Sequence, residues 1–312
     1  MKKILFLIVL VFSVAARAQE SDFVLHTPTG DIYGTIAVPK TDKQMPLVLL
    51  IAGSGPTDRN CNQTAQSLKT DAFKMLADSL LKYNIASLRF DKRGIGESAP
   101  AMTKEDDLRF DTYINDVKAW IDTLAKNNKF SKIVVAGHSE GSLIGMAAAV
   151  DNAKTAQYIS ISGVAVAADE ILKEQLATQP QEVKDMVFPM LDTLKAGRTI
   201  ADVNPMFYSL FRPSIQPYMI SWMRRNPQAE IAKLKIPILI IQGTTDIQVS
   251  ENQAKLLHSA NPKSTLVIIK EMNHVLKTCA TTDQAAQMAT YASPDFPLAD
   301  GFVKAIVEFV KQ

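Results

Sequence analysis

The sequence predicts an α/β fold with a mostly parallel sheet of eight strands, helices on both faces and a helical cap insertion. Three observations lead to this prediction. Short apolar runs alternate with amphipathic stretches along most of the 312 residues, as expected for parallel strands joined by helices. Several runs are apolar at every position, which is typical of strands covered on both faces. The alternation lapses once, over about residues 165–230, and this lapse marks the cap.

The N-terminal 18 residues have the pattern of a signal peptide. Lys2 and Lys3 precede a short apolar run, and alanines flank Arg17 before the expected cut. We therefore expect an exported chain, periplasmic or secreted, that starts at Gln19 and forms one domain over residues 19–312. After signal removal it should have no stable membrane span, because the apolar run is too short to cross a bilayer. A retained N-terminal anchor is the alternative.

Composition argues against some classes of partner. The formal net charge is +2 and no basic block stands out, so nucleic-acid binding is not expected. A metal or organic cofactor is not expected either, because the two cysteines and four histidines show no ligand spacing. The sequence makes no prediction of the oligomeric state.

The first half of the chain supplies six of the predicted strands. Two of them, residues 24–27 and 32–38, flank a turn signal and predict a β-hairpin at a sheet edge. The next four are apolar runs separated by one-sided helical patterns. These strands are residues 47–51, 85–90, 133–136 and 158–163, and the helices are residues 71–83, 112–127 and 143–150.

The cap follows, and then the sheet is completed. Residues 169–227 contain no convincing strand, and their helical stretches are broken by prolines. Methionines and aromatic residues gather there, which suits the adaptable lining of a substrate pocket; the alternative is that they pack the cap onto the sheet. The helical stretches are residues 171–176, 183–194 and 206–223. Strands at residues 236–241 and 265–269 and helices at residues 251–259 and 300–310 complete the domain.

The turn Gly137-His138-Ser139-Glu140-Gly141 is the centre of the predicted chemistry. It joins a β-branched strand to a run of helix formers, and its glycines leave room where a Cβ would clash. Such a turn lifts the Ser139 hydroxyl out of the sheet at the N-terminus of a helix. Ser139 is therefore the candidate nucleophile. The alternative is a glycine-lined turn with a buried serine.

A serine nucleophile needs a base, which must come from a loop at the carboxyl end of a strand. His138 is next to Ser139, and its own position in the turn prevents it from reaching back to the Ser139 hydroxyl. Among the other three histidines, only His274 lies in a loop directly after a predicted strand, so we predict that His274 is the general base. The other three are expected to have surface, packing or pocket-shaping roles. They are His26 in the hairpin, His138 beside the serine and His258 within a helix.

The base in turn needs a carboxylate to orient it, from a loop between the serine and the histidine. Asp246 lies just past the strand predicted over residues 236–241 and is the candidate. The rivals are Asp169, near the start of the cap, and Asp283, beyond the histidine.

Backbone N–H groups should hold the oxyanion. One predicted donor is the N–H of Glu140, directly after the nucleophile and near a helix N-terminus. The second is expected in the loop after the strand at residues 47–51. Ser54 is the candidate there, and Gly53 is the alternative.

Four motifs together resemble the α/β-hydrolase superfamily. They are the turn around Ser139, Asp91-x-Arg93-Gly94-x-Gly96-x-Ser98, Gly243-x-x-Asp246 and Asn273-His274. The order Ser139, Asp246, His274 along the chain is also that of the superfamily. The loop Gly53-Ser54-Gly55-Pro56-Thr57-Asp58-Arg59-Asn60 resembles more narrowly the bacterial EstD-like carboxylesterases, although Cys61 stands where such relatives tend to have glycine. The resemblance covers roughly residues 22–312 and implies hydrolysis of short-chain carboxylic esters.

The leading hypothesis is thus an exported serine carboxylesterase with a small-molecule ester as its partner. Ser139, His274 and Asp246 would act as a triad through an acyl-enzyme intermediate. A serine aminopeptidase or an acyl transferase on the same scaffold is the second hypothesis, since a fold does not fix the substrate. A non-catalytic binding protein is the third, and the intact triad argues against it.

Four further residues near the predicted site have open roles. Asp58 and Arg59 either brace the oxyanion loop, touch substrate or form an exposed turn pair. Cys61 and Cys279 should both lie at the carboxyl-end rim of the sheet. In an exported chain they either form a disulfide or remain two separate thiols.

Overall fold

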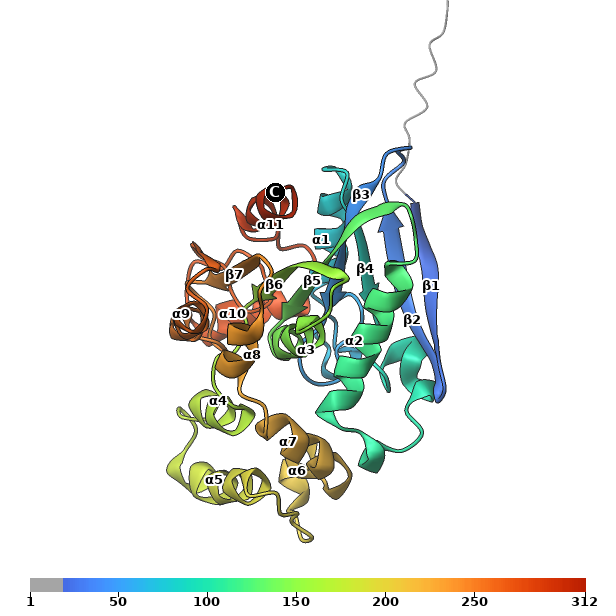
Figure 1. Ribbon diagram of the computed structural model, residues 1–312. Helices are drawn as coiled ribbons and strands as arrows, with labels where there is room; N and C mark the ends of the chain where they lie inside the picture. The colour runs from blue at the N-terminus through green and yellow to red at the C-terminus, as the bar shows by residue number, and fades with distance from the viewer. Residues whose placement is uncertain (1–18) are drawn as a thin grey trace, which may run out of the picture.

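An eight-stranded sheet runs through the centre of the molecule (Figure 1). The computed structural model describes residues 19–312, so the predicted signal peptide lies outside the described residues. The strand order is β1-β2-β4-β3-β5-β6-β7-β8. The β1–β2 and β2–β4 pairs are antiparallel and the other five pairs are parallel. The strands are β1 (Gln19–Thr27), β2 (Gly30–Val38), β3 (Met45–Ile51), β4 (Ala86–Phe90), β5 (Phe130–His138), β6 (Thr155–Ile161), β7 (Ile238–Gly243) and β8 (Thr265–Ile269).

Helices cover both faces of this sheet, which explains the continuous apolar runs in strands such as β3 and β7. In β3, Leu47 and Leu49 point into one core, whereas Val48 and Leu50 point into the other. The first core contains side chains of α2 (Phe110–Leu124), α3 (Glu140–Ala149), α8 (Pro227–Lys233) and α9 (Glu251–Ala260). The second contains side chains of α1 (Ala72–Leu81) and α11 (Phe302–Val310). The predicted fold class is confirmed.

Between β6 and β7 the chain forms helices and no strand. The helices ahead of α8 are α4 (Ala168–Gln175), α5 (Gln181–Lys195), α6 (Tyr208–Phe211) and α7 (Gln216–Met223). Figure 1 shows α4–α7 grouped together at the lower end of the view, away from α1 and α11. Tyr218 and Trp222 of α7 line the same cavity as Ser139, so these helices lie over the carboxyl end of β5.

Several elements differ from expectation. Helix α8 was not predicted, and several strand and helix bounds shift by two or three residues. Two further differences have a clear physical reason. The edge strand β1 begins at Gln19, five residues before the predicted start, because backbone pairing with β2 continues through a polar stretch that needs no burial. A helix that the pattern did not predict, α10 (Gln284–Ala292), follows Asp283, whose carboxylate accepts a hydrogen bond from the Ala286 N–H at 2.9 Å. In residues 19–312, no helix is both long enough and apolar enough to cross a membrane.

Candidate active site

The turn between β5 and α3 is sharply strained at Ser139. The serine has φ 53° and ψ −122°, a conformation that L-residues adopt only when the surrounding structure enforces it. Its N–H donates to Ile161 O at 2.9 Å. A Cβ on Gly137 would lie 2.1 Å from Gly141 O, and one on Gly141 would lie 2.4 Å from Ile51 O. Both glycines are therefore required, because any side chain there would collide with backbone.

Asp246 and His274 follow β7 and β8, and the sheet brings them together. His274 Nδ1–H donates to Asp246 Oδ2 at 2.9 Å, which leaves Nε2 free to accept a proton. The N–H groups of Gln248 and Val249 donate to Asp246 Oδ1 at 2.8 and 2.9 Å. Burial alone would raise the pKa of Asp246, but His274 and these backbone donors hold it below its ordinary value. The carboxylate is thus kept ionised and fixed in place.

The rival residues have other partners. Asp169 accepts a hydrogen bond from Lys195 Nζ at 2.7 Å, and Asp283 caps α10. His26 contacts Asp31 in the hairpin at 2.8 Å. His258, within α9, contacts Ser264 Oγ at 2.8 Å.

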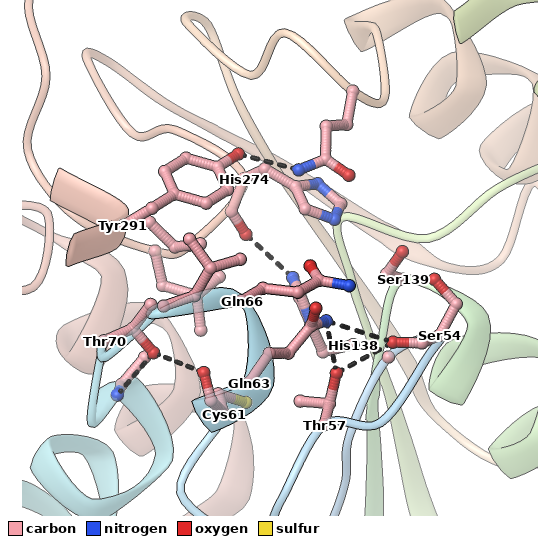
Figure 2. Close-up of a pocket in the computed structure, with 16 residues that line it drawn as sticks. Ser54, Thr57, Cys61, Gln63, Gln66, Thr70, His138, Ser139, His274 and Tyr291 are labelled. Carbon is pink, nitrogen blue, oxygen red and sulfur yellow. Dashed lines mark hydrogen bonds between the residues drawn. The ribbon is translucent and has the colours of Figure 1, made fainter. Parts of the chain in front are cut away.

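His138 packs against His274 rather than against the serine hydroxyl. The two ring centroids are 4.7 Å apart, and His138 Nε2–H donates to His274 O at 2.8 Å. Burial lowers the pKa of His138 to about 3, so the ring is neutral at physiological pH. Figure 2 shows this ring at the floor of the pocket below His274. Its hydrogen bond helps to fix the loop that carries His274.

Ser54 and Glu140 flank Ser139, and a residue that the sequence did not single out connects them. Lys92 Nζ donates to Gly53 O at 2.6 Å and to Glu140 Oε1 at 3.0 Å. The Lys92 and Glu140 side chains are each only 3% exposed. The Gly53 carbonyl and the Ser54 N–H belong to one peptide plane and point in opposite directions. Lys92 therefore fixes the direction of the Ser54 N–H.

The Glu140 N–H, the other predicted oxyanion donor, is free to donate to a substrate oxygen. Glu140 is the first residue of α3, so its N–H has no partner within the helix. The only signal for Lys92 in the sequence is its position inside the Asp91-x-Arg93-Gly94 motif, which follows β4. A lysine in a loop is usually exposed, and only the structure reveals its burial between two other loops.

Asp58 braces its own loop, Arg59 ties that loop to the segment after β4, and neither residue lines a cavity at Ser139. Asp58 Oδ1 accepts hydrogen bonds from the N–H groups of Asn60 and Asn62, both at 2.8 Å. The Arg59 guanidinium contacts Asp91 at 2.7 Å and also contacts Glu97. Of the three roles considered from the sequence, these contacts correspond to bracing of the oxyanion loop.

Cys61 and Cys279 are free thiols in the structure. The disulfide considered from the sequence is not formed, and the alternative of two separate thiols describes the molecule. Cys61 lines the pocket beside Ser139, and burial raises the pKa of its thiol. Cys279 instead makes a 3.4 Å contact with Thr281 O, so the two sulfurs face different surroundings.

Two cavities meet at Ser139. The smaller, of about 210 Å³, lies between residues 53–72, residues 274–276 and Tyr291, and His274 lines it (Figure 2). The larger, of about 530 Å³, extends under the cap and is lined by apolar residues such as Met219 and Trp222. Ser54, Gln66, Ser139 and Gln248 border both cavities. An acyl group and a leaving group can therefore be held on opposite sides of the serine.

Comparisons with known proteins identify the family. Residues 69–278 match the family described as "Serine aminopeptidase, S33". Esterase EstD of Thermotoga maritima is 26% identical over 249 residues, which is 78% of this chain and 57% of that protein. The chain thus spans little more than half the length of this relative.

Solved structures give the same fold. Est1E from Butyrivibrio proteoclasticus superposes with a TM-score of 0.60 at 16% identity, over 93% of this chain and 99% of that one. The Pyrococcus furiosus esterase Pf2001 has a TM-score of 0.58 at 18% identity, over 94% of this chain and 91% of that one. The resemblance drawn from the sequence motifs is confirmed, and the chain belongs to the serine aminopeptidase S33 family of α/β-hydrolases.

Proposed function

We propose that this protein is an exported serine carboxylesterase that hydrolyses short-chain carboxylic esters. One observation carries the proposal. Ser139 stands in a strained turn, and His274, bonded to Asp246, lines the same cavity. The similarity to Esterase EstD supports an ester as the substrate. Export is proposed on the pattern of residues 1–18, and N-terminal sequencing of the mature protein should find Gln19 first.

The proposed reaction follows the serine-hydrolase sequence of steps. His274 Nε2 takes the Ser139 hydroxyl proton as Oγ attacks the ester carbonyl. The N–H groups of Ser54 and Glu140 donate to the oxyanion of the tetrahedral intermediate. His274 then protonates the leaving alcohol oxygen as the C–O bond breaks. Water, deprotonated by His274, cleaves the acyl-enzyme, which releases the acid and restores the serine.

A short acyl group suits the cavity under the cap. Apolar side chains line part of it, but so do charged ones, among them Arg93 and the ion-paired Glu105 and Arg212. A long alkyl chain would have to desolvate these charges, which is unfavourable. A short chain can remain on the apolar side.

The aminopeptidase hypothesis is weaker for a related reason. An aminopeptidase needs a free carboxylate to bind the α-ammonium group of its substrate. Only Glu105 and Glu140 supply carboxylates to the two cavities within the described residues. Each is already paired with a cation, Arg212 and Lys92 respectively. An ester needs no such partner.

The test compares p-nitrophenyl esters of increasing acyl length with aminoacyl p-nitroanilides. We expect hydrolysis of the esters, with kcat/KM highest for short acyl chains. A phosphonate label should map to Ser139, and Ser139→Ala should abolish both labelling and turnover. Anilide hydrolysis without ester hydrolysis would overturn the esterase proposal in favour of a peptidase. Labelling at another residue would refute the mechanism.

A further inference from the structure

We infer that the natural leaving alcohol is a neutral, hydroxyl-rich group about the size of one sugar ring, bound in the smaller of the two cavities at Ser139. The inference rests on the proposed esterase function and adds the class of substrate. Three features carry it: which cavity His274 lines, which hydrogen-bonding groups face that cavity, and how large the cavity is.

The position of His274 decides which side holds the alcohol. The leaving oxygen must receive its proton from His274 Nε2, so it must lie within hydrogen-bond reach of that ring. His274 and its neighbour Val275 line the smaller cavity, whereas neither lines the larger one. The alcohol therefore belongs in the smaller cavity, and the acyl group belongs under the cap.

The lining of the smaller cavity is polar without carrying a formal charge. Within the described chain it includes no Asp, Glu, Lys or Arg side chain, so a charged leaving group would enter without a counter-ion. Apart from Ser139, the rings of His138 and His274 and the Cys61 thiol, its polar side chains are amides and hydroxyls. They are Ser54, Thr57, Gln63, Gln66, Thr70, Gln248 and Tyr291. Amides and hydroxyls can both donate and accept, as the hydroxyl groups of a polyol do.

Several of these groups are free to bind a ligand. Figure 2 shows the Gln66 side chain reaching into the cavity, and within residues 19–312 its amide makes no hydrogen bond to another residue. Gln248 Nε2 donates to the Tyr291 hydroxyl at 2.8 Å, which leaves that O–H free to donate and Gln248 Oε1 free to accept. Gln66 and Gln248 are exposed, so an alkyl alcohol would displace water from these amides without replacing its hydrogen bonds, whereas a hydroxylated alcohol would replace them.

Size and apolar contacts narrow the class further. The cavity measures about 210 Å³, and a cavity of about 150 Å³ is enough for a benzene molecule. One substituted six-membered ring therefore fits, and a second ring would have to lie outside the cavity. Leu68, Val275 and the ring of Tyr291 also line the cavity, so the C–H faces of such a ring would find apolar contacts.

The first experiment varies the alcohol while the acyl group stays acetyl. Initial rates are measured on methyl, hexyl, glyceryl and monosaccharide acetates, and kcat/KM is compared. We expect the glyceryl and monosaccharide esters to exceed the hexyl ester by at least about tenfold. A hexyl preference would overturn the inference while leaving the esterase proposal intact. Activity that survives Ser139→Ala would instead overturn the proposed function.

Matched Leu→Trp variants then locate the alcohol. Leu68 lines only the smaller cavity and Leu172 lines only the larger one. Leu68→Trp should lower kcat/KM for the monosaccharide ester at least about tenfold, with little change for the methyl ester, because it fills the ring site. Leu172→Trp should change the dependence on acyl length and leave the ratio between alcohols unchanged. The reverse pattern would assign the alcohol to the cap and refute the inference.

A third variant tests the polar contacts, and a polymer distinguishes the source of the ring. Tyr291→Phe removes the hydroxyl and keeps the ring, and Tyr291 lines the smaller cavity but not the larger one. It should therefore reduce the preference for hydroxylated over hexyl acetates about tenfold; an equal loss on all esters would contradict the assignment. Acetylated xylan, a polysaccharide ester, is compared with the free monosaccharide acetates to distinguish the two sources of the ring. Release of acetate from free sugar esters but not from xylan supports a free, single-ring alcohol. Release from xylan alone would overturn the single-ring size.

Discussion

Lys92→Met is the perturbation that best separates catalysis from folding in this site. Lys92 Nζ bonds both Gly53 O, at 2.6 Å, and Glu140 Oε1, at 3.0 Å. Methionine fills much of the same volume but donates to neither. The Gly53–Ser54 peptide is then free to turn, and a displacement of about 1 Å can cost about 100-fold in rate. Loss of an oxyanion donor altogether costs about 10²–10³ in kcat. We expect kcat to fall about 10- to 100-fold.

Stability changes as well, for a different reason. Lys92→Met leaves the Glu140 carboxylate buried without its partner, and breaking a buried pair in this way costs about 3–5 kcal/mol. The double variant Lys92→Met/Glu140→Gln removes both charges, so we expect it to recover most of that stability. It does not restore the bond to Gly53 O, so its kcat should stay low. Glu140→Gln alone is the matched control, because Lys92 still holds the Gly53 carbonyl.

The assay is steady-state hydrolysis of p-nitrophenyl acetate, with stability measured by urea unfolding. KM should change little, because the N–H contact strengthens mainly as the oxyanion forms. A double variant with kcat within about threefold of the wild type would show that Lys92 acts only through stability, and it would refute the positioning argument. The double variant carries no unpaired buried charge, so we expect it to fold. Its kcat therefore tests the argument even if the single variant fails to fold.

The remaining predictions concern the residues around this centre. Asp246→Asn should reduce kcat by about 10⁴ while the protein stays folded, because the His274 tautomer is no longer held; kinetics with circular dichroism checks this. Burial lowers the pKa of His138 from 6.5 to about 3, so protonation below pH 6.5 favours the unfolded chain. Urea unfolding should therefore show a loss between pH 7 and pH 5 that is smaller by about 2 kcal/mol in His138→Gln. Gly141→Ala should destabilise the fold by more than about 3 kcal/mol, because its Cβ would lie 2.4 Å from Ile51 O; thermal unfolding at wild-type temperature would contradict this.

Much of the fold could be predicted because strands that are buried on both faces have continuous apolar sequences. In β3, every residue from Leu47 to Ile51 is apolar and buried, as expected for a strand that is covered on both faces. The edge strand β1 has no such constraint. Its first residues are polar, so its extent depends on backbone pairing with β2, which composition does not report. Helix α10 is not predicted either, because two of the three residues that it buries are the polar Gln287 and Thr290, so its sequence shows no apolar stripe.

The candidate site divides in the same way. Ser139, Asp246 and His274 could be selected because each lies at the end of a strand, and topology brings strand ends together. Lys92 could not, because its importance depends on three loops meeting. Nothing in the sequence near Lys92 indicates that Gly53 and Glu140 lie within reach of its amine. Whether Cys61 meets Cys279 depends equally on loop conformation, and there the structure has two separate thiols.

The buried Lys92–Glu140 pair is difficult to explain by stability alone. Replacing a buried ion pair with apolar residues of similar volume is often neutral or stabilising. Such residues would pack against Tyr113, whose ring lies 5.0 Å from Lys92 Nζ, but they would leave the Gly53 carbonyl without a donor. Lys92, two residues after β4, bonds that carbonyl while the carboxylate of the residue that follows the nucleophile holds its amine. The charge of Glu140 thus fixes Lys92, Lys92 fixes the Gly53–Ser54 peptide, and both proposed oxyanion donors are tied to a single buried contact.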